Sequence, residues 1–445
     1  MSNDGPANGG PAIAARGRQP RIPGAEAGAG RVDVLILGAG AAGLACACEA
    51  SRRGLGVLLL ERGRSPGRKL SACGGGRANF SNRSVTPEDY LCRSDAAFCR
   101  HALASLPPER VLRRIQGWRL PVEERDHGRL FLKVPAIRLV RALEDECAAH
   151  GCRLACGAEV RAVQREDGGF AVDDGKRIWR ARAVVLALGS PACPALGGSA
   201  AGWRIAAALG HTLTPARPAL VPLRLPEVTP LGAALRGLAG ISLPARLTLA
   251  HAVEGKTRIW EDDLLFTHTG LSGPLVLGAS LFWRDGHALE LDLLPGQDTE
   301  ALLDVGGART PRALLRRFLP QRLLDAVLPP EPARRKCAEL SRQARRQLAA
   351  AVHALRVTPS GTGGLDRAEA CSGGVDTGEV DPRTMESRLI PGLHIVGEML
   401  DVTGRLGGYN LHWAWASGIR AGRSVLAGAE GRLTGRKTAS PRTAR

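Results

Sequence analysis

The chain has 445 residues, 44% of them hydrophobic, which is enough for two to four packed units with a sizeable core. The net charge is +18, but only six of the 61 cations are lysine and aromatic residues make up 4%, so the charge reflects an arginine-rich composition and we do not expect nucleic acid as a partner. No apolar run reaches the roughly 18 residues of a membrane helix. The 11 cysteines contain no C-x2-C pair and indicate neither a disulfide framework nor a metal site.

Both ends of the chain are expected to be disordered tails. Residues 1–30 are rich in Gly, Ala, Pro and Arg and lack the apolar segment of a signal peptide. Residues 429–445 are strongly basic. We therefore expect a cytoplasmic protein whose folded part lies between these tails.

The segment VDVLILGAGAAGLACACEASRRG, residues 32–54, predicts a dinucleotide-binding unit. A buried strand leads into the G-x-G-x-x-G glycines Gly38, Gly40 and Gly43, and a helix follows. The glycines allow a tight turn, approach of a pyrophosphate and close helix packing, and the helix N-terminus offers free N–H groups to phosphate. The next strand, LGVLLLE, ends at Glu61, which can accept hydrogen bonds from a ribose and argues against a 2′-phosphate. This motif alone leaves FAD and NAD open.

The segment GRKLSACGGGRANFSN, residues 67–82, has no apolar period of 3.6 or 2 residues, and we expect a loop. Its three glycines, Gly74–Gly76, lie between the cations Arg68, Lys69 and Arg77. Such a loop fits either a solvated basic segment or a backbone cradle for phosphate.

Two later blocks carry strands that end in glycine. Short alternating runs broken by EDGG and DDGK predict a three-stranded meander that returns to a buried strand, residues 183–188, before Gly189. Residues 393–396 predict another strand before Gly397 and Glu398, and a helix is expected from residue 409 onward. This order resembles flavoproteins with two dinucleotide-binding domains, in which FAD lies extended across the first domain. The resemblance implies that Val160 lies near the adenine, Glu398 binds the ribitol, and the helix N-terminus faces the flavin carbonyl edge.

Five motifs together resemble a bacterial family of NAD(P)/FAD-dependent oxidoreductases that includes aminoacetone oxidases and bile-acid oxo-reductases. They are GRKLSACGGGRANFSN, PALVPL (218–223), FTHTGLSGP (266–274), CSGGV (371–375) and GEMLDVTGRLGGYNLHWAWASG (397–418). The chain departs from the family pattern at Cys73, Ala78, Cys371 and His412, where the family has serine, cysteine, threonine and glutamine. Ala78 removes any need for the family cysteine as a redox thiol here.

The resemblance implies an α/β fold: a split Rossmann-like FAD domain with a small inserted β-barrel-like domain and a helical insert. The FAD domain would comprise residues 31–212 and 372–428, the barrel-like domain 213–297 and 351–371, and the helical insert 298–350. The apolar residues of the insert recur at helical spacing, which agrees with this division.

The expected cofactor site combines the glycine motif with the residues that the resemblance adds. The triple-glycine segment would run along the extended FAD, with Arg68 and Lys69 reaching toward the pyrophosphate or ribose. The predicted FAD contacts are Gly38, Gly40, Ala41, Ala42, Gly43, Glu61, Arg62, Arg68, Lys69, Gly75, Gly76, Val160, Ala187, Gly189, Gly397, Glu398, Asp401, Gly407, Gly408, Asn410 and Leu411.

The expected reaction is hydride transfer between flavin and a small organic substrate, with NAD(P)H as the reductant. Arg77, Asn79 and Tyr409 are the catalytic candidates; His211 and His268 could transfer protons but are more typical of structural histidines. Two alternatives stay open: a flavoprotein that acts on nucleic acid, as tRNA-modifying enzymes do, and a flavin-binding redox sensor without catalysis.

Overall fold

The computed structural model describes residues 31–250 and 255–427 of the chain; both predicted tails lie outside these residues. The described residues form two compact units, one of residues 31–217 and 371–427 and one of residues 218–250 and 255–370. No helix among the described residues is long and apolar enough to cross a membrane. The finer division, with residues 298–350 as a separate helical insert, stays a prediction.

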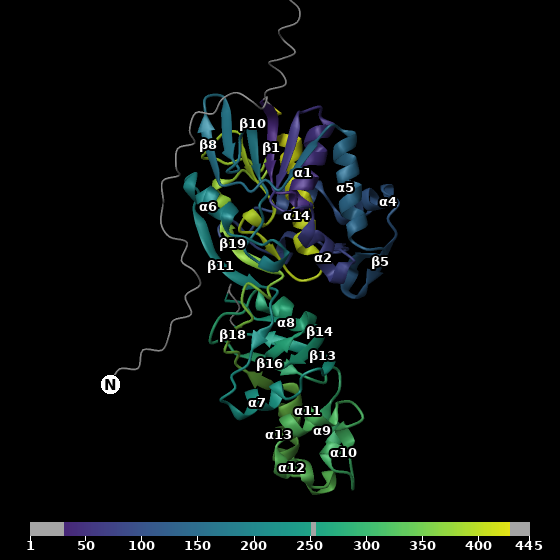
Figure 1. Cartoon of the computed structure of the whole chain (residues 1–445). Helices are drawn as coiled ribbons and strands as arrows, with labels where there is room; N and C mark the ends of the chain where they lie inside the picture. Colours follow the sequence, from purple (N-terminus) through teal and green to yellow (C-terminus); the bar gives the residue numbers. More distant parts are fainter. Residues whose placement is uncertain (1–30, 251–254, 428–445) are drawn as a thin grey trace, which may run out of the picture. The chain divides into compact units, whose positions relative to one another are not determined.

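The first unit is built on a seven-stranded sheet with a parallel centre (Figure 1). In the order β7-β2-β1-β10, each strand pairs in parallel with the next, and β20 pairs in parallel with β10. The parallel strands are β1 (Val32–Leu37), β2 (Val57–Glu61), β7 (Arg153–Cys156), β10 (Ile178–Leu186) and β20 (Leu393–Ile395). Residues 34–37 are fully buried, as expected for strands covered on both faces.

The predicted meander extends the sheet on its antiparallel side. Strands β8 (Ala162–Glu166) and β9 (Gly169–Asp173) pair antiparallel with each other, and β9 pairs with the first half of β10. The third strand of the meander and the buried strand expected after it are therefore one continuous strand. Turns at EDGG and DDGK connect these strands, where the sequence predicts them.

Three long helices pack beside this sheet: α1 (Ala41–Arg52), α5 (Ile137–Ala149) and α14 (Tyr409–Ser424). α14 crosses α1 so closely that a Cβ on Gly418 would lie 2.3 Å from the carbonyl oxygen of Ala42. The remaining elements of the unit are α2 (Arg68–Gly76), β3 (Asn79–Asn82), β4 (Tyr90–Leu91), α3 (Arg100–Ser105), α4 (Pro108–Gly117), β5 (Val122–Arg125), β6 (Arg129–Leu132), α6 (Ala201–Ala208) and β21 (Thr403–Gly404).

The segment 67–82 is not the loop that the sequence predicts. Residues 68–72 form a helical turn at the start of α2, and the backbone leaves helical geometry at Cys73, Gly74 and Gly75. Leu70 is the one residue of α2 that is buried, so an apolar period could not reveal this helix. After the glycines the chain forms β3, which pairs antiparallel with β6.

The second unit combines an antiparallel sheet with a group of short helices. The sheet has the order β17-β16-β13-β14-β15-β12-β18, and its strands are β12 (Leu223–Arg224), β13 (Ser242–Leu249), β14 (Arg258–Thr267), β15 (Gly270–Ser272), β16 (Leu289–Asp292), β17 (Leu355–Val357) and β18 (Gly361–Thr362). Its helices are α7 (Pro230–Arg236), α8 (Gly273–Ser280), α9 (Thr299–Asp304), α10 (Pro311–Leu315), α11 (Gln321–Val327), α12 (Pro330–Arg334) and α13 (Arg342–His353). The chain passes between the units in β11 (Leu213–Ala219) and β19 (Ala370–Val375), which pair.

We predict that Gly43→Ala destabilises the first unit by about 1–3 kcal/mol, the usual range for overpacking. A Cβ at this position would lie 1.9 Å from the carbonyl oxygen of Gly38, so α1 would have to move away from the loop after β1. Urea unfolding followed by circular dichroism measures the change. Gly117→Ala at the end of α4 is the control, because a Cβ there meets nothing within 4 Å. Equal stability of the two variants would contradict the prediction.

Candidate cofactor site

Four loops meet at the carboxyl edge of the parallel strands in the first unit. The Gly38 loop follows β1, Glu61 ends β2, Gly189 follows β10, and Glu398 follows β20. A Cβ on Gly38 would lie 2.4 Å from the carbonyl oxygen of Ala187, so the first and third loops touch. In open parallel sheets this edge is where ligands bind, at the point where the strand order reverses.

The N-terminus of α1 lies open at this edge. Its N-cap is Gly40, and no side chain among the described residues caps its first turn, Ala41–Gly43. A Cβ on Gly40 would meet no atom of the described residues within 4 Å, so there is free space in front of the helix. Uncapped N–H groups and the positive end of the helix dipole suit a pyrophosphate at this place.

Glu61 connects the ends of β1 and β2. One carboxylate oxygen accepts a hydrogen bond from the backbone N–H of Ala39 (2.9 Å), and the other accepts from that of Gly63 (2.7 Å). The two bonds fix the carboxylate beside the glycine loop and leave lone pairs on both oxygens. The side chain is half-buried, and its predicted contact with a ribose stays a prediction.

Glu398 forms a three-residue cluster at the same edge. Lys69 donates to both of its carboxylate oxygens (2.8 and 2.9 Å), and the hydroxyl of Ser190 donates to one of them (2.8 Å). The cluster joins α2 to the loops after β10 and β20. The sequence predicts Lys69 and Glu398 as separate FAD contacts but not their ion pair, and it does not single out Ser190.

Two predicted cations contact a neighbouring loop. Arg62 donates to the carbonyl oxygen of Gly197 (3.0 Å), and Arg68 donates to that of Ala195 (3.1 Å). Both side chains are exposed at the rim of the site. Val160 is buried, two residues after Ala158, whose N–H donates to the carbonyl oxygen of Glu61 (2.9 Å).

The start of α14 is held against β3. The N-cap Gly408 has φ +95°, and a Cβ there would lie 2.3 Å from the carbonyl oxygen of Ser81. The amide of Asn79, oriented by its hydrogen-bond network, accepts from the N–H of Gly408 (3.1 Å) and donates to the carbonyl oxygens of Leu130 and Ser81. Asn79 therefore positions the helix.

Asn410 and Asp401 each hydrogen-bond to the backbone of a glycine, Gly404 and Gly373 respectively. The amide of Asn410 donates to the carbonyl oxygen of Gly404 (2.8 Å) and accepts from its N–H (2.9 Å), so this side chain fixes the loop and does not cap α14. Asp401 is fully buried and accepts from the N–H of Gly373 (2.9 Å). Burial raises the pKa of its carboxyl, and Arg93 and Thr214 reduce that shift.

The three catalytic candidates lie in different surroundings. Tyr409 is buried, and its hydroxyl accepts a hydrogen bond from Arg405 (2.6 Å), while burial raises its pKa. Asn79 bonds to backbone groups, as described above. Arg77 is exposed and donates to the carbonyl oxygen of Lys133 (3.0 Å). His211, considered above for proton transfer, is buried. Its ring nitrogens lie 2.8 Å from a carboxylate oxygen of Glu379 and 3.0 Å from the hydroxyl of Ser387, as is typical of a structural histidine.

These residues fit an FAD molecule. The free space at Gly40 and the uncapped N-terminus of α1 suit the pyrophosphate, and Glu61 suits the ribose of the adenosine. Gly75 also faces open space, since a Cβ there would meet no atom of the described residues within 4 Å. The site would hold the cofactor in an extended conformation, with its redox chemistry supplied by the isoalloxazine ring.

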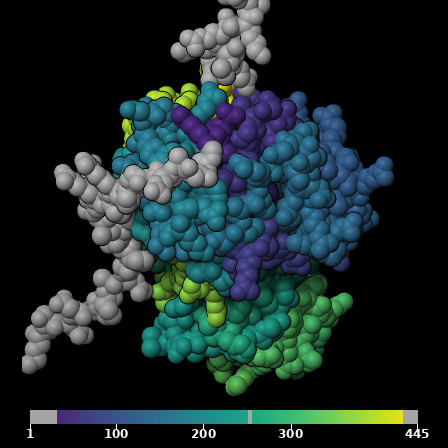
Figure 2. Space-filling model, turned by 45° about the horizontal axis from the view of Figure 1, so that its top comes forward, coloured from purple at the N-terminus to yellow at the C-terminus, as the bar shows by residue number. Residues whose placement is uncertain are grey.

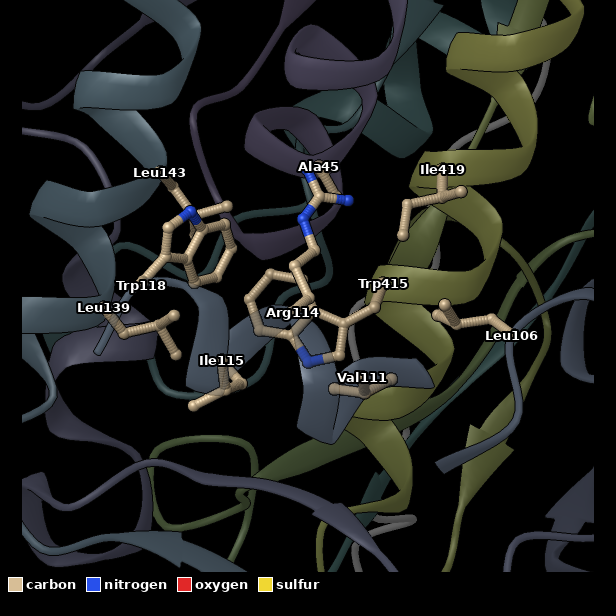
Figure 3. A pocket seen from close by; sticks show the side chains of 10 residues that line it. All are labelled: Ala45, Leu106, Val111, Arg114, Ile115, Trp118, Leu139, Leu143, Trp415 and Ile419. Carbon is tan, nitrogen blue, oxygen red and sulfur yellow. The ribbon is translucent and has the colours of Figure 1, made fainter. Parts of the chain in front are cut away.

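An apolar pocket of the first unit lies elsewhere (Figure 3). It is enclosed by the middle of α1 and by α4, α5 and α14, and its lining includes Trp118, Trp415 and Ile419. Arg114 crosses it and donates to Glu49 and Glu146 (2.8 Å each). None of the predicted FAD contacts lines this pocket, so we assign it to helix packing.

The chain matches the family model described as HI0933-like protein Rossmann domain over residues 32–424. The chain belongs to this family. As a member it is a flavoprotein of the oxidoreductase type with an FAD-binding Rossmann fold, which confirms the expected family, the α/β fold class and FAD as the cofactor.

Three curated relatives match almost over their full lengths. The ribosomal RNA dihydrouridine synthase of Escherichia coli is 36% identical over 405 residues, covering 89% of this chain and 98% of the relative. Its counterpart in Haemophilus influenzae is 34% identical, with 88% and 98% covered. The 3-dehydro-bile acid delta(4,6)-reductase of Clostridium scindens is 32% identical, also with 88% and 98% covered. Two of the three names refer to RNA.

We predict that Glu61→Gln weakens FAD binding about 10- to 100-fold, the usual loss for a hydrogen bond to a charged group. Two N–H donors face the carboxylate, and the glutamine amide would place its own NH2 against one of them. FAD retention is measured by absorbance after gel filtration and by titration of the apoprotein. Glu166→Gln at the end of β8 is the control. Equal retention in both variants would contradict the role of Glu61.

His412, a departure from the family pattern, lies fully buried in α14. Its Nδ1 is 2.8 Å from the hydroxyl of Ser81, and its Nε2 is 2.9 Å from the carbonyl oxygen of Leu106. A neutral ring satisfies both contacts when Nε2–H donates to the carbonyl and Nδ1 accepts from the hydroxyl. Burial lowers the pKa of this ring to about 4, so it is uncharged at neutral pH.

We predict that His412 makes the protein less stable in mild acid. The unfolded chain takes up the proton near pH 6.5 but the folded chain only near pH 4, so stability falls between these values and then levels off, by up to about 3 kcal/mol. His412→Gln keeps a donor and an acceptor and should remove this loss. Urea unfolding from pH 7 to pH 4 measures it, with the exposed His101→Gln as control. A constant difference from the unchanged protein across this range would refute the prediction.

Proposed function

We propose that this protein reduces uridine in ribosomal RNA to dihydrouridine, with FAD as cofactor and NAD(P)H as reductant. The observation that carries the proposal is the match to the Escherichia coli enzyme at 36% identity over 98% of its length. A second RNA-directed relative matches over an equal share of its length. The open alternative of a flavoprotein acting on nucleic acid thus becomes our leading hypothesis.

The chemistry named for the relatives supports the proposal. The uracil ring has a C5=C6 bond conjugated with the C4 carbonyl, and a 3-dehydro-4,6-diene steroid has carbon–carbon double bonds conjugated with its C3 carbonyl. FAD, once bound and reduced by NAD(P)H, would supply a hydride to the β-carbon of such a bond, and the α-carbon would take up a proton. One site chemistry thus accounts for relatives whose substrates differ greatly in size.

The chain's own residues would position the cofactor and stabilise charge. Glu61 and the N-terminus of α1 would hold the adenosine and pyrophosphate half, and the Lys69–Glu398–Ser190 cluster would hold the middle. The N-terminus of α14, fixed by Asn79, would direct its positive dipole end toward the flavin carbonyl edge.

Arg77 is our proposed substrate contact. Its guanidinium is exposed beside the triple glycine, next to the exposed Lys133. Two neighbouring cations suit a phosphate or a carbonyl oxygen of a bound nucleotide. Asn79 and Tyr409 stay predictions as catalytic residues, and the contacts of both fit positioning of α14.

The test uses ribosomal RNA from a strain that lacks the gene for this protein. The FAD-loaded protein is incubated with this RNA and NADH or NADPH without oxygen, and dihydrouridine is measured by mass spectrometry of the digested nucleosides. We expect dihydrouridine at a defined position. Arg77→Ala should lower its formation about tenfold or more, as loss of a charged contact does, without loss of FAD. Arg138→Ala, an exposed cation in α5, is the control.

A small-molecule reductase is the second candidate, because the bile-acid enzyme matches over the same share of its length. The same preparation is therefore also offered a 3-oxo-4,6-diene steroid. Reduction of the steroid with no dihydrouridine in the RNA would favour this second candidate. Bound flavin that is reduced but passes its electrons to neither substrate would contradict both.

A further inference from the structure

The end of α12 and two connecting segments of the second unit carry a group of exposed cations that form no ion pair with acidic residues in the described part of the chain. Four of them, Arg309, Arg334, Arg335 and Lys336, are all exposed, and we call them the basic corner. The helices belong to the green part of the surface in Figure 2. In the part of the chain that the structure describes, no ion pair within 4.0 Å involves any of the four.

Backbone hydrogen bonds bring the four residues together. The N–H of Cys337 donates to the carbonyl oxygen of Arg309 (2.8 Å), and the N–H of Ala338 donates to that of Gly307 (3.0 Å). The loop before α10 is thereby held against the turn after α12. Cys337 is buried at this junction, so the backbone that carries the basic corner is packed.

The acidic residues nearby are mostly paired with other arginines. Asp325 pairs with Arg312 (3.1 Å), Glu300 with Arg346 (4.0 Å), and Asp304 with Arg345. Two further acids of the same region, Glu331 and Glu339, are exposed and form no ion pair with the corner among the described residues. The corner keeps a net positive charge when both are counted.

We propose that the basic corner is a docking surface for the phosphate backbone of ribosomal RNA. The inference rests on the proposed function and adds to it where the RNA binds on the chain. A polyanion is the partner that four exposed cations without an ion pair fit, because each phosphate contact releases bound counterions. A small bile-acid-like substrate would have no use for such a surface.

The quadruple variant Arg309→Gln, Arg334→Gln, Arg335→Gln, Lys336→Gln tests the corner. RNA affinity is measured by fluorescence anisotropy with ribosomal RNA fragments between 50 and 200 mM salt (about the range where such contacts respond). We expect affinity to fall about tenfold or more and the slope of log K against log salt to become shallower by about 3. KM for RNA should rise to match, while kcat stays unchanged.

A matched control removes four exposed cations from the first unit: Arg113→Gln, Arg138→Gln, Arg153→Gln and Lys176→Gln. Equal loss of affinity in both quadruple variants would overturn the proposal, because net charge alone would then explain it. Unchanged RNA affinity and salt slope in the corner variant would also overturn the proposal. So would a corner variant that loses binding to phosphatidylglycerol vesicles but keeps its affinity for RNA. The double variant Arg335→Gln, Lys336→Gln should show about half the change in slope and serves if the quadruple variant unfolds.

The two proposals fail in different ways. If the unchanged protein, loaded with FAD and reduced, forms no dihydrouridine in ribosomal RNA, the proposed function is wrong. If it does form dihydrouridine and the corner variant has the same KM and salt slope, the docking surface alone is wrong.

Discussion

The close approach of backbone to backbone around the first turn of α1 is the constraint on which the rest of the first unit depends. Gly43 in this turn approaches the loop after β1, and Gly418 of α14 approaches the turn, so closely that a Cβ would lie 1.9 Å from the carbonyl oxygen of Gly38 and 2.3 Å from that of Ala42. The loop after β20 also touches this turn, since a Cβ on Gly397 would lie 2.9 Å from that of Ala42. No side chain of the described residues caps this turn, so its first N–H groups stay free for a ligand. Segments more than 300 residues apart in the sequence thereby shape one site.

The cluster of Lys69, Glu398 and Ser190 has a second consequence. It joins α2, the loop after β10 and the loop after β20, so three segments that contribute to the site share one ion pair and one hydrogen bond. Both charged side chains are partly exposed, so the pair contributes little stability by itself. The ion pair matters instead because it positions both side chains at the site. A cofactor that displaced one partner would contact the other, which would then offer it a charge or a hydrogen bond.

The sequence predicts the parts of this site that depend on backbone geometry. The spacing of Gly38, Gly40 and Gly43 is typical of a tight turn followed by a closely packed helix. Glu61 then follows at the end of an apolar strand. The helix α2 could not be predicted in the same way, because Leu70 is its one buried residue and residues 73–75 leave helical geometry. The hydrogen bonds of Asn79 and Asn410 could not be predicted either, since both side chains bond to backbone groups of distant or irregular segments.

Charge shows why composition is a poor guide to partners. The net charge of +18 in an arginine-rich chain does not show which surface carries the positive charge. On that ground the sequence does not predict nucleic acid as a partner. What matters is which cations have acidic neighbours. Arg312 and Arg346 lie beside carboxylates and present little free charge, whereas Arg309 and Arg335 have no such neighbour within 4.0 Å among the described residues. A polyanion responds to the second kind of cation, because a guanidinium that is already paired must lose one partner to gain another. Four exposed cations without an ion pair, carried by a packed backbone, are therefore a stronger argument for RNA than the total charge of the chain.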